Sequence, residues 1–286
     1  MHVVRPSDPR AFLEAARPLL AADPRAEARH NLILGLAGTL ADDPEVYPTH
    51  HLWVVLDGDR PVAAALMTPP YNLVLAEPAG DEALATLLGA VRADKVTVPG
   101  IVGNLPHVRT AAERWATSSG VTVRVVQSQG VYALTRVLDV RPAPGAPRAA
   151  TFAERDLLVR WLTDFAAEAL PTGEDAERIE RSIDARLAGA HRGLWFWTIE
   201  DEPVSLAGFG GRTPSGIRVG PVYTPPEHRR RGYAINLVAE LSRWLLAQGY
   251  HACFLYTDLA NPTSNRIYGD IGYERVADSV EYRFSG

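Results

Sequence analysis

The stretch RVGPVYTPPEHRRRGYA, residues 218–234, decides how this chain is interpreted. Its first residues are typical of a strand, and a tight proline-containing loop then leads into a helix. Within the loop, the pattern Arg229-x-x-Gly232-x-Ala234 puts small residues where the backbone can come close to a ligand. Apolar residues at helical spacing indicate the helix: Ile235, Leu237, Val238, Leu241, Trp244 and Leu245.

A loop that feeds a helix N-terminus is suited to an anion. The unpaired amide groups and the positive end of the helix dipole point the same way there. Three consecutive arginines, Arg229, Arg230 and Arg231, add charge that can reach further phosphate groups. The sequence therefore predicts a pyrophosphate site at this loop. The alternative is a solvated arginine cluster at the start of a helix.

Two common phosphate motifs do not fit this loop. A P-loop requires a lysine, and the one lysine of the chain, Lys95, is far from it in sequence. A dinucleotide-binding fold requires GxGxxG with an acidic residue about 20 positions later, and neither feature is found here. The loop instead resembles the acetyl-CoA pyrophosphate loop of the GNAT N-acetyltransferase superfamily, whose pattern is Gln/Arg-x-x-Gly-x-Gly/Ala. The resemblance implies acetyl-CoA as co-substrate, bound by Val222, Tyr223, Thr224, Arg229, Arg230, Arg231, Gly232, Tyr233 and Ala234.

A second segment is similar to another GNAT signature. Residues 251–257 are an apolar, partly aromatic run that predicts a buried strand. Asn261 before Pro262 then makes a favourable helix entry, and Gly272 is a suitable helix end. The two segments stand in the order that the superfamily shows, with a helix and a strand between them.

The second signature assigns roles to individual residues by resemblance. Asn261 contacts the pantetheine arm, with Asn265 as a further candidate on the same helix face. Tyr268 protonates the departing CoA thiolate. The alternative for Asn261 is a simple N-cap, and the alternative for Tyr268 is an aromatic side chain that packs its helix onto the sheet.

Acyl transfer requires a neutral amine and a polarised thioester carbonyl. By resemblance, backbone N–H groups of residues 222–224 polarise that carbonyl, and such donors commonly contribute the largest single catalytic term. The strand over 217–223 carries no carboxylate, so no general base is identified there. Asp258, at the end of the next strand, can serve as base directly or through water, or it can be a polar turn residue.

Three carboxylates near the start of the second half are candidates for attracting a cationic acceptor. Glu168, Glu174 and Asp175 lie where the first two helices of that half meet. This region lines the acceptor cleft in the superfamily. The alternative is that they are ordinary solvated side chains.

The chain is predicted to contain two domains of the same α/β (α+β) class, each a mixed, mostly antiparallel sheet flanked by helices. Residues 141–149, with three prolines and a glycine among the first eight, read as a linker between a domain at 1–140 and a domain at 150–286. Each half repeats the element order αα-ββ-β-α-β-α-ββ. In the first half the elements are predicted at 11–20, 26–40, 51–56, 61–68, 72–76, 81–92, 96–102, 105–118, 121–126 and 130–137. In the second half they are predicted at 154–169, 174–190, 193–200, 203–211 and 217–223, then as the cofactor helix, the strand at 251–257, the signature helix, and a final hairpin at 275–276 and 280–284.

The first half lacks the chemistry of the second. Where the second half has Arg229–Ala234, the first has Glu77–Glu82, whose carboxylates would repel a pyrophosphate. Ala111 follows Asn104 at the spacing at which Tyr268 follows Asn261. Residues 1–140 are therefore predicted to be a degenerate, non-catalytic GNAT-like domain that supports the active half. The rival interpretation is that they bind a second ligand.

Composition sets outer bounds on function. The net charge of −5 argues against nucleic acid or an anionic membrane as the main partner. The chain contains no apolar run of about 18 residues and no N-terminal apolar segment, so neither a membrane span nor a signal peptide is expected. The single cysteine, Cys253, cannot form an internal disulfide. These features predict a cytoplasmic protein.

Two function classes remain open from the sequence. The first is an acetyl-CoA-dependent N-acetyltransferase that acts on the primary amine of a small molecule or peptide. The second is a regulatory module that binds acyl-CoA without turnover. No metal is expected, because neither an HExxH motif nor a cysteine cluster occurs. The sequence does not identify the acceptor or the oligomeric state.

Overall fold

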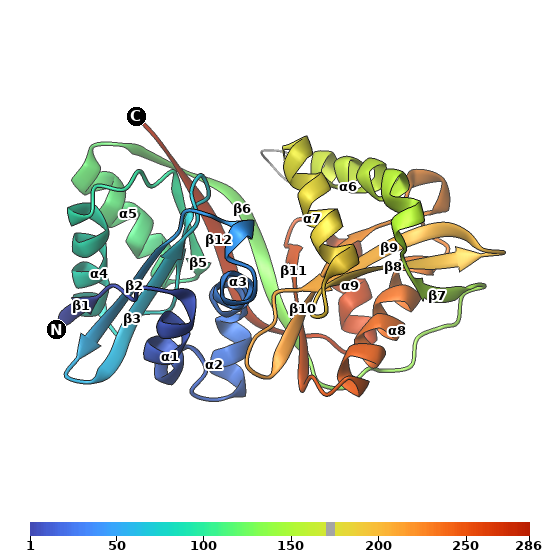
Figure 1. The fold of residues 1–286 in the computed structure, drawn as a ribbon, viewed down its shortest axis with the longest axis horizontal. Coiled ribbons are helices and arrows are strands. Elements are labelled where there is room, and N and C mark those ends of the chain that lie inside the picture. The colour runs from blue at the N-terminus through green and yellow to red at the C-terminus, as the bar shows by residue number, and fades with distance from the viewer. Residues whose placement is uncertain (170–174) are drawn as a thin grey trace. The chain divides into compact units, whose positions relative to one another are not determined.

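The computed structural model describes residues 1–169 and 175–286, and these divide into two compact units (Figure 1). Unit 1 comprises Met1–Val131, Asp258–Ala260 and Arg275–Gly286, and unit 2 comprises Tyr132–Thr257 and Asn261–Glu274. Among the described helices, none is both long enough and apolar enough to cross a membrane.

Unit 1 is a mixed sheet with helices on both faces. Its strands follow the order β1-β2-β3-β4-β5-β12-β6, and β4 and β5 run parallel. The strands are β1 (His2–Val4), β2 (His51–Asp57), β3 (Arg60–Met67), β4 (Leu73–Leu75), β5 (Gly100–Asn104), β6 (Thr122–Leu134) and β12 (Glu274–Ser285). The helices are α1 (Pro9–Leu20), α2 (Pro24–Arg29), α3 (Asn31–Asp42), α4 (Asp81–Ala93) and α5 (His107–Ser119).

Unit 2 repeats this arrangement. Its strands follow the order β11-β10-β9-β8-β7, and β10 and β11 form the parallel pair. The strands are β7 (Ala146–Ala149), β8 (Gly193–Ile199), β9 (Glu202–Gly210), β10 (Gly216–Tyr223) and β11 (Ala252–Asp258). The helices are α6 (Arg155–Ala169), α7 (Ala176–Ala188), α8 (Tyr233–Ala247) and α9 (Pro262–Ile271).

Each sheet is buried on both faces. In unit 1, one core lies between the sheet and α1 with α3, and the other between the sheet and α4 with α5. In unit 2, α6 and α7 cover one face, and α8 and α9 cover the other (Figure 1). Because the strands are buried on both faces, their sequences are nearly continuous runs of apolar residues.

Local sequence signals set several helix starts. Asp8 and Asp23 each accept backbone hydrogen bonds at an N-cap, and each precedes a proline at the first helical position. Asn261 does the same ahead of Pro262 at α9. These signals fix where the chain changes from loop to helix.

The predicted fold class is confirmed, because both units are mixed, mostly antiparallel sheets flanked by helices. The repeat itself differs in three details. Each unit begins with an edge strand that the sequence did not reveal, β1 in unit 1 and β7 in unit 2. Each half ends in one long strand, β6 or β12, rather than in the predicted hairpin. The helix predicted over 26–40 is interrupted at His30, which separates α2 from α3.

The chain also divides differently from the predicted pattern of 1–140, a linker at 141–149, and 150–286. Part of the predicted linker is strand β7, whose residues pair with Trp195–Thr198 of β8. The last strand, β12, pairs antiparallel with β5, from Ser279 opposite Asn104 to Arg283 opposite Gly100. The C-terminal strand of the chain therefore completes the sheet of unit 1.

Candidate active site

The strands β10 and β11 separate where the candidate site begins. Their parallel ladder covers only Gly216–Arg218 on β10 and Ala252–Phe254 on β11, although the strands continue to Tyr223 and Asp258. On its other side β10 stays paired with β9, with a register shift between Val219 and Val222. The later part of β10, with Val222 and Tyr223, is thus held from the β9 side, and its backbone groups facing β11 lie outside the ladder.

Side chains brace the end of β10. The hydroxyl of Ser205, which is fully buried on β9, donates to the carbonyl oxygen of Tyr223 at 3.2 Å and lies 2.8 Å from the Thr224 hydroxyl. Burial raises the pKa of the Tyr223 phenol, and the nearby carboxylates of Glu168 and Asp164 raise it further. The residues predicted to polarise a thioester carbonyl therefore occupy a fixed strand end.

Gly232 shapes the loop that follows. Its φ of 83° lies in the left-handed region, and it is the N-cap residue of α8. Because glycine has no side chain to accept from the first-turn amides, those donors remain directed toward the end of the helix. Both the anion site and the contact with acetyl-CoA stay predictions.

Asn236 is a part of the site that the sequence did not reveal. Its buried side-chain amide donates to the carbonyl oxygen of Gly232 at 2.8 Å and to that of Arg141 at 3.1 Å. The side chain therefore ties the glycine turn to the segment that precedes β7. In the sequence, the one hint of this contact is that Asn236 follows Gly232 by one helical turn.

The three arginines of the loop differ in their surroundings. Arg229 donates two hydrogen bonds to Glu168 and one to the carbonyl oxygen of Thr224. Arg230 and Arg231 are exposed, and Arg230 has a positive φ of 62°. Tyr233 is buried in the core between α8 and the sheet, and its ring centroid lies 6.5 Å from that of His228. Ala234 follows Tyr233 in the first turn of α8.

The signature asparagines are part of a hydrogen-bonded start to α9. Asn261 caps the helix, because its Oδ1 accepts from the Ser264 amide at 3.1 Å. Asn265 donates from Nδ2 to the carbonyl oxygen of Asn261 at 2.7 Å. Its Oδ1 accepts from the hydroxyl of Tyr132 at 3.1 Å, a contact that sequence spacing alone does not reveal because 133 positions separate the two residues.

Tyr268 lies on α9 in the apolar core that α8 and α9 form with the sheet. Its ring makes an edge contact with Tyr273, with 6.0 Å between centroids. Burial raises the pKa of its phenol to about 12. The packing alternative thus describes its surroundings in this structure, and the catalytic role stays a prediction.

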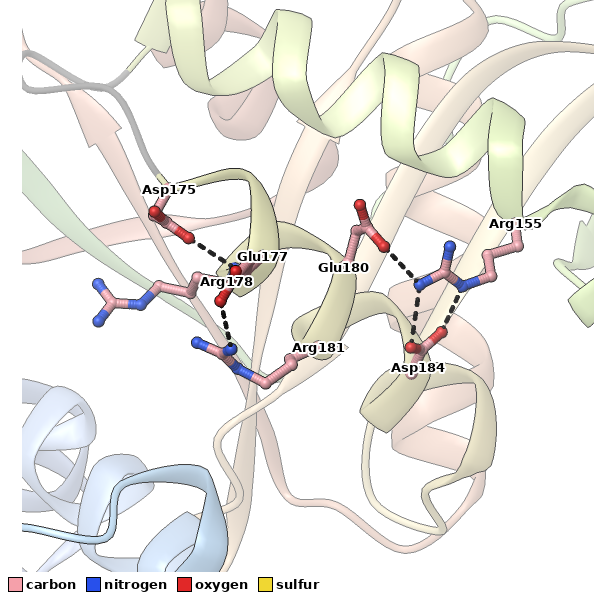
Figure 2. Close-up of polar contacts among 7 residues, drawn as sticks. All are labelled: Arg155, Asp175, Glu177, Arg178, Glu180, Arg181 and Asp184. Atoms are coloured by element: carbon pink, nitrogen blue, oxygen red, sulfur yellow. Dashed lines mark hydrogen bonds and ion pairs between the residues drawn. The ribbon is translucent and has the colours of Figure 1, made fainter.

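Two of the predicted acceptor carboxylates and the candidate base Asp258 make hydrogen bonds within the chain. Glu168 pairs with Arg229 at 2.6 Å. Asp175 caps α7 by accepting from the Arg178 amide at 3.2 Å, as Figure 2 shows. Asp258 accepts from the Ala260 amide at 2.7 Å, as expected of a turn residue. Glu174 lies outside the described residues.

Figure 2 also shows ion pairs that involve Arg155 of α6 and several charged side chains of α7. Arg155 of α6 donates to Asp184 at 2.7 Å and to Glu180 at 2.9 Å, and these carboxylates raise the pKa of its guanidinium. Arg181 lies 3.4 Å from Glu177 one turn away. The carboxylates of α7 that Figure 2 draws, Glu177, Glu180 and Asp184, therefore each lie beside an arginine of α6 or α7. Within 1–169 and 175–286, no group of three or more potential metal-ligating side chains comes together.

Comparisons with known proteins find similar sequences and similar folds. Residues 199–283, from the end of β8 into β12, match the family model for FR47-like proteins. An aminoglycoside N(6')-acetyltransferase type 1 from Serratia marcescens is 34% identical over 62 residues, which are 22% of this chain. The match spans 42% of the length of that relative.

Solved structures extend the likeness to the whole chain. A tandem GNAT protein from the clavulanic acid biosynthesis pathway has a TM-score of 0.60 at 14% identity, and the match covers 99% of this chain and 98% of that one. A GCN5-related N-acetyltransferase from Sphaerobacter thermophilus also has a TM-score of 0.60, at 18% identity, with 99% of this chain and 94% of that chain covered. The resemblance to the GNAT N-acetyltransferases that the two sequence signatures indicate is therefore confirmed. At these identities the structural matches show the fold alone.

Proposed function

We propose that this GNAT-fold chain is an acetyl-CoA-dependent N-acetyltransferase that moves an acetyl group to a primary amine. The observation that carries the proposal is the juxtaposition in unit 2 of two features. The left-handed Gly232 turn opens the N-terminus of α8, and the strand before it, β10, leaves its ladder with β11 after Arg218. The first feature suits a pyrophosphate, and the second offers backbone groups to an extended, amide-containing arm.

The reaction joins the amine nitrogen to the acetyl carbon and breaks the carbon–sulfur bond. The amine must arrive neutral, and the proton that its nitrogen loses must pass to a base or to water. The sulfur leaves with the bonding electron pair as a thiolate. Backbone amides at Val222, Tyr223 and Thr224 are the proposed donors to the developing oxyanion, and the brace from Ser205 keeps that strand end in place.

Tyr268 is the proposed hydrogen-bond donor to the leaving sulfur. A phenol whose pKa is raised to about 12 stays protonated at neutral pH. Complete proton transfer to a thiolate is uphill from this state, because an ordinary thiol has a pKa of about 8.5. We therefore propose that Tyr268 stabilises the thiolate by hydrogen bonding, in place of the full protonation that the family resemblance implies.

The proposed acceptor is the primary amine of a small molecule or a peptide. The Serratia relative is named for acetylating an aminoglycoside, which makes aminoglycosides one class to test here. Asp258 is engaged by its turn and Glu168 by Arg229, so we propose water as the route for the amine proton. The non-catalytic role of residues 1–140 is part of the same proposal.

A second candidate function is an acyl-CoA-binding module without turnover. The observation that favours it is the burial of Tyr268 in the core that α8 and α9 form with the sheet, where its ring packs against Tyr273. In this alternative the loop at Gly232 still binds the cofactor, but no amine reaches the thioester.

The test separates binding from turnover. Calorimetry measures the affinity for CoA, and a thiol-reactive dye measures CoA release from acetyl-CoA with a panel of aminoglycosides, polyamines, amino acids and peptides. Amine-dependent thiol release supports the enzyme. Binding of CoA with no release above hydrolysis for any amine supports the binding module, and absence of CoA binding contradicts both.

A further inference from the structure

The Arg229 side chain turns back from the loop toward the end of β10 and the end of α6. Its Nε donates to the carbonyl oxygen of Thr224 at 2.9 Å. Its Nη2 donates to both carboxylate oxygens of Glu168, at 2.8 Å and 2.6 Å. Its guanidinium carbon lies 5.9 Å from the ring centre of Tyr223. All four residues belong to unit 2.

These contacts have a consequence for the charge of the loop. A guanidinium carries five N–H donors, and the Nε and Nη2 groups of Arg229 hold three of them. The positive charge of Arg229 is balanced locally by the Glu168 carboxylate. The neighbouring Arg230 and Arg231 are exposed, and the structure gives neither an ion pair of this kind within the part of the chain that it describes.

We propose that Arg229 is a positioning residue that fastens the C-terminal end of α6 to the end of β10, and that Arg230 and Arg231 supply the charge for the phosphates. This inference rests on the proposed function, in which Thr224 and the residues before it act on the thioester. Through its bond to the Thr224 carbonyl, Arg229 fixes the backbone whose amides face the reacting group. Through Glu168, it keeps α6 beside that backbone.

The energetics favour a geometric role over a role in stability. The side chains of Arg229 and Glu168 are 42% and 47% exposed, so the pair contributes only about 0–1 kcal/mol to folding. Variants of either residue therefore fold. A small displacement of reacting groups is far more costly to rate, up to about 10²-fold for 1 Å.

The first experiment compares two acetyl donors. S-acetylpantetheine carries the thioester and the amide arm of acetyl-CoA but has neither pyrophosphate nor adenosine. If Arg229 positions the strand end, Arg229→Ala should lower kcat about tenfold with both donors and leave the donor KM little changed. Arg231→Ala should instead raise the KM for acetyl-CoA and have much less effect with S-acetylpantetheine. A defect of Arg229→Ala that disappears with S-acetylpantetheine would show that Arg229 binds phosphate and would overturn the inference.

A double-mutant cycle tests the partner. Glu168→Gln keeps the shape of the side chain and removes the charge, so it should reproduce most of the loss in kcat. The double variant should be no worse than Arg229→Ala alone, because the two side chains act as one unit. Additive losses, or wild-type kcat in Glu168→Gln, would contradict the proposed fastening.

Amide hydrogen exchange decides the inference independently of turnover. Arg229→Ala and Glu168→Gln should both speed exchange in the last turn of α6 and in the segment after Tyr223. Arg243→Ala is the matched control, since it breaks the Arg243–Glu240 pair on α8, where both side chains are 43% exposed. Unchanged exchange in the Arg229 and Glu168 variants would overturn the inference, even if thiol release with wild-type protein supports the proposed enzyme. A wild-type protein that releases no thiol with any amine would contradict the enzyme and leave the exchange result to decide the fastening.

Discussion

The starts of α4 and α8 occupy the same place in the fold of the two units, but the side chains around them carry opposite charge. Each helix follows a strand that runs parallel to the next strand, β4 beside β5 and β10 beside β11. At α8, Gly232 and a run of arginines leave the helix start positive. At α4, the N-cap Gly80 is followed by two acidic residues in the first turn, and one of them, Asp81, pairs with Arg114 at 2.9 Å.

The ends of β4 and β10, the strands that precede these helices, also differ. The ladder with β5 runs to the end of β4 at Leu75, and the Ala76 amide then bonds back to Ala64 of β3. Just beyond, Glu77 accepts from Arg29 at 2.8 Å and from Asn104 at 3.0 Å, and its own amide donates to Nε2 of His30 at 3.1 Å. Unit 1 therefore closes this position with its own side chains, whereas in unit 2 the ladder between β10 and β11 ends at Arg218.

The comparison teaches which features of the scaffold carry function. A parallel strand–helix–strand unit supplies a helix start and a strand end, and both present unpaired backbone groups. In unit 1 the amides just after the strand end are paired within the chain, that of Ala76 with the Ala64 carbonyl oxygen and that of Glu77 with Nε2 of His30. Under the proposed function, the positive turn in unit 2 leaves these groups for the phosphates of acetyl-CoA. Each prediction below changes one side of this contrast.

The largest effect is expected at the glycine of unit 2. Gly232→Trp should abolish measurable acetyl-CoA binding, because the side chain would fill the predicted pyrophosphate space. The left-handed backbone at this position adds a cost of about 1–2 kcal/mol for a non-glycine residue. Calorimetric titration with CoA measures the loss.

Gly80→Trp is the matched control in unit 1. A side chain at Gly80 would enter open space, and its φ of 169° is extended backbone that any residue adopts. CoA affinity should stay at the wild-type value. If Gly80→Trp weakened binding and Gly232→Trp did not, the assignment of the cofactor to unit 2 would be wrong.

The next largest effect is expected at Tyr268. Tyr268→Phe removes one hydroxyl and keeps the ring, so kcat should fall by roughly 10-fold or more while CoA affinity changes little. Tyr273→Phe is its control, because the Tyr273 hydroxyl lies 2.9 Å from the Ser242 hydroxyl in the same core. That variant should lose about 1 kcal/mol of stability and keep its kcat. Normal kcat in Tyr268→Phe with reduced stability would support packing as the role of Tyr268.

A smaller effect, on stability alone, is expected at the closed end of unit 1. Glu77→Ala leaves Arg29 and Asn104 without their shared acceptor and should lower the free energy of unfolding by about 1–3 kcal/mol. Glu82→Ala, at an exposed position in the first turn of α4, should stay within about 0.5 kcal/mol. Urea denaturation compares the three proteins. A loss of kcat in Glu77→Ala at unchanged stability would mean that unit 1 takes part in catalysis.

The contrast between the loops was predictable from sequence, since Glu77–Glu82 and Arg229–Ala234 differ in charge at matching positions. The hydrogen-bonded network around the Glu77 carboxylate was not predictable from sequence. It joins Glu77 to Arg29 and Asn104, which lie 48 and 27 positions away, and only the tertiary fold brings them together. The sequence indicated that unit 1 lacks an anion site, and the structure explains what fills its place.

Strand pairs were likewise predictable from sequence only where the two strands are close together along the chain. Alternation and turn residues revealed the hairpins around Asp57–Arg60 and Glu200–Glu202, where the contacts are local. The prolines of 141–149 indicated a linker, yet Pro147 lies in an edge strand, where a proline needs no ladder partner on its outer side. The placement of β12 beside β5 depends on a partner about 180 positions away, which local pattern does not encode.

The smallest effect concerns pH and tests whether the unit 1 network depends on charge. Burial lowers the pKa of His30, and this outweighs the opposing effect of the Glu77 carboxylate. Below pH 6.5, its ordinary value, the unfolded chain binds a proton at His30 more readily than the folded chain, so stability should fall as the pH drops through this range. A protonated ring also carries a hydrogen on Nε2, which then loses its acceptor role toward the Glu77 amide.

The Glu77 pKa is itself lowered, because hydrogen bonds from Arg29 and Asn104 outweigh its burial, so its own contribution should persist until the pH falls below about 4.5. His30→Gln should therefore flatten the stability profile between these two values while leaving the acid limb, measured by urea denaturation at each pH. An identical slope in wild type and His30→Gln would show that His30 titrates alike in both states and that the network at Glu77 is held without it.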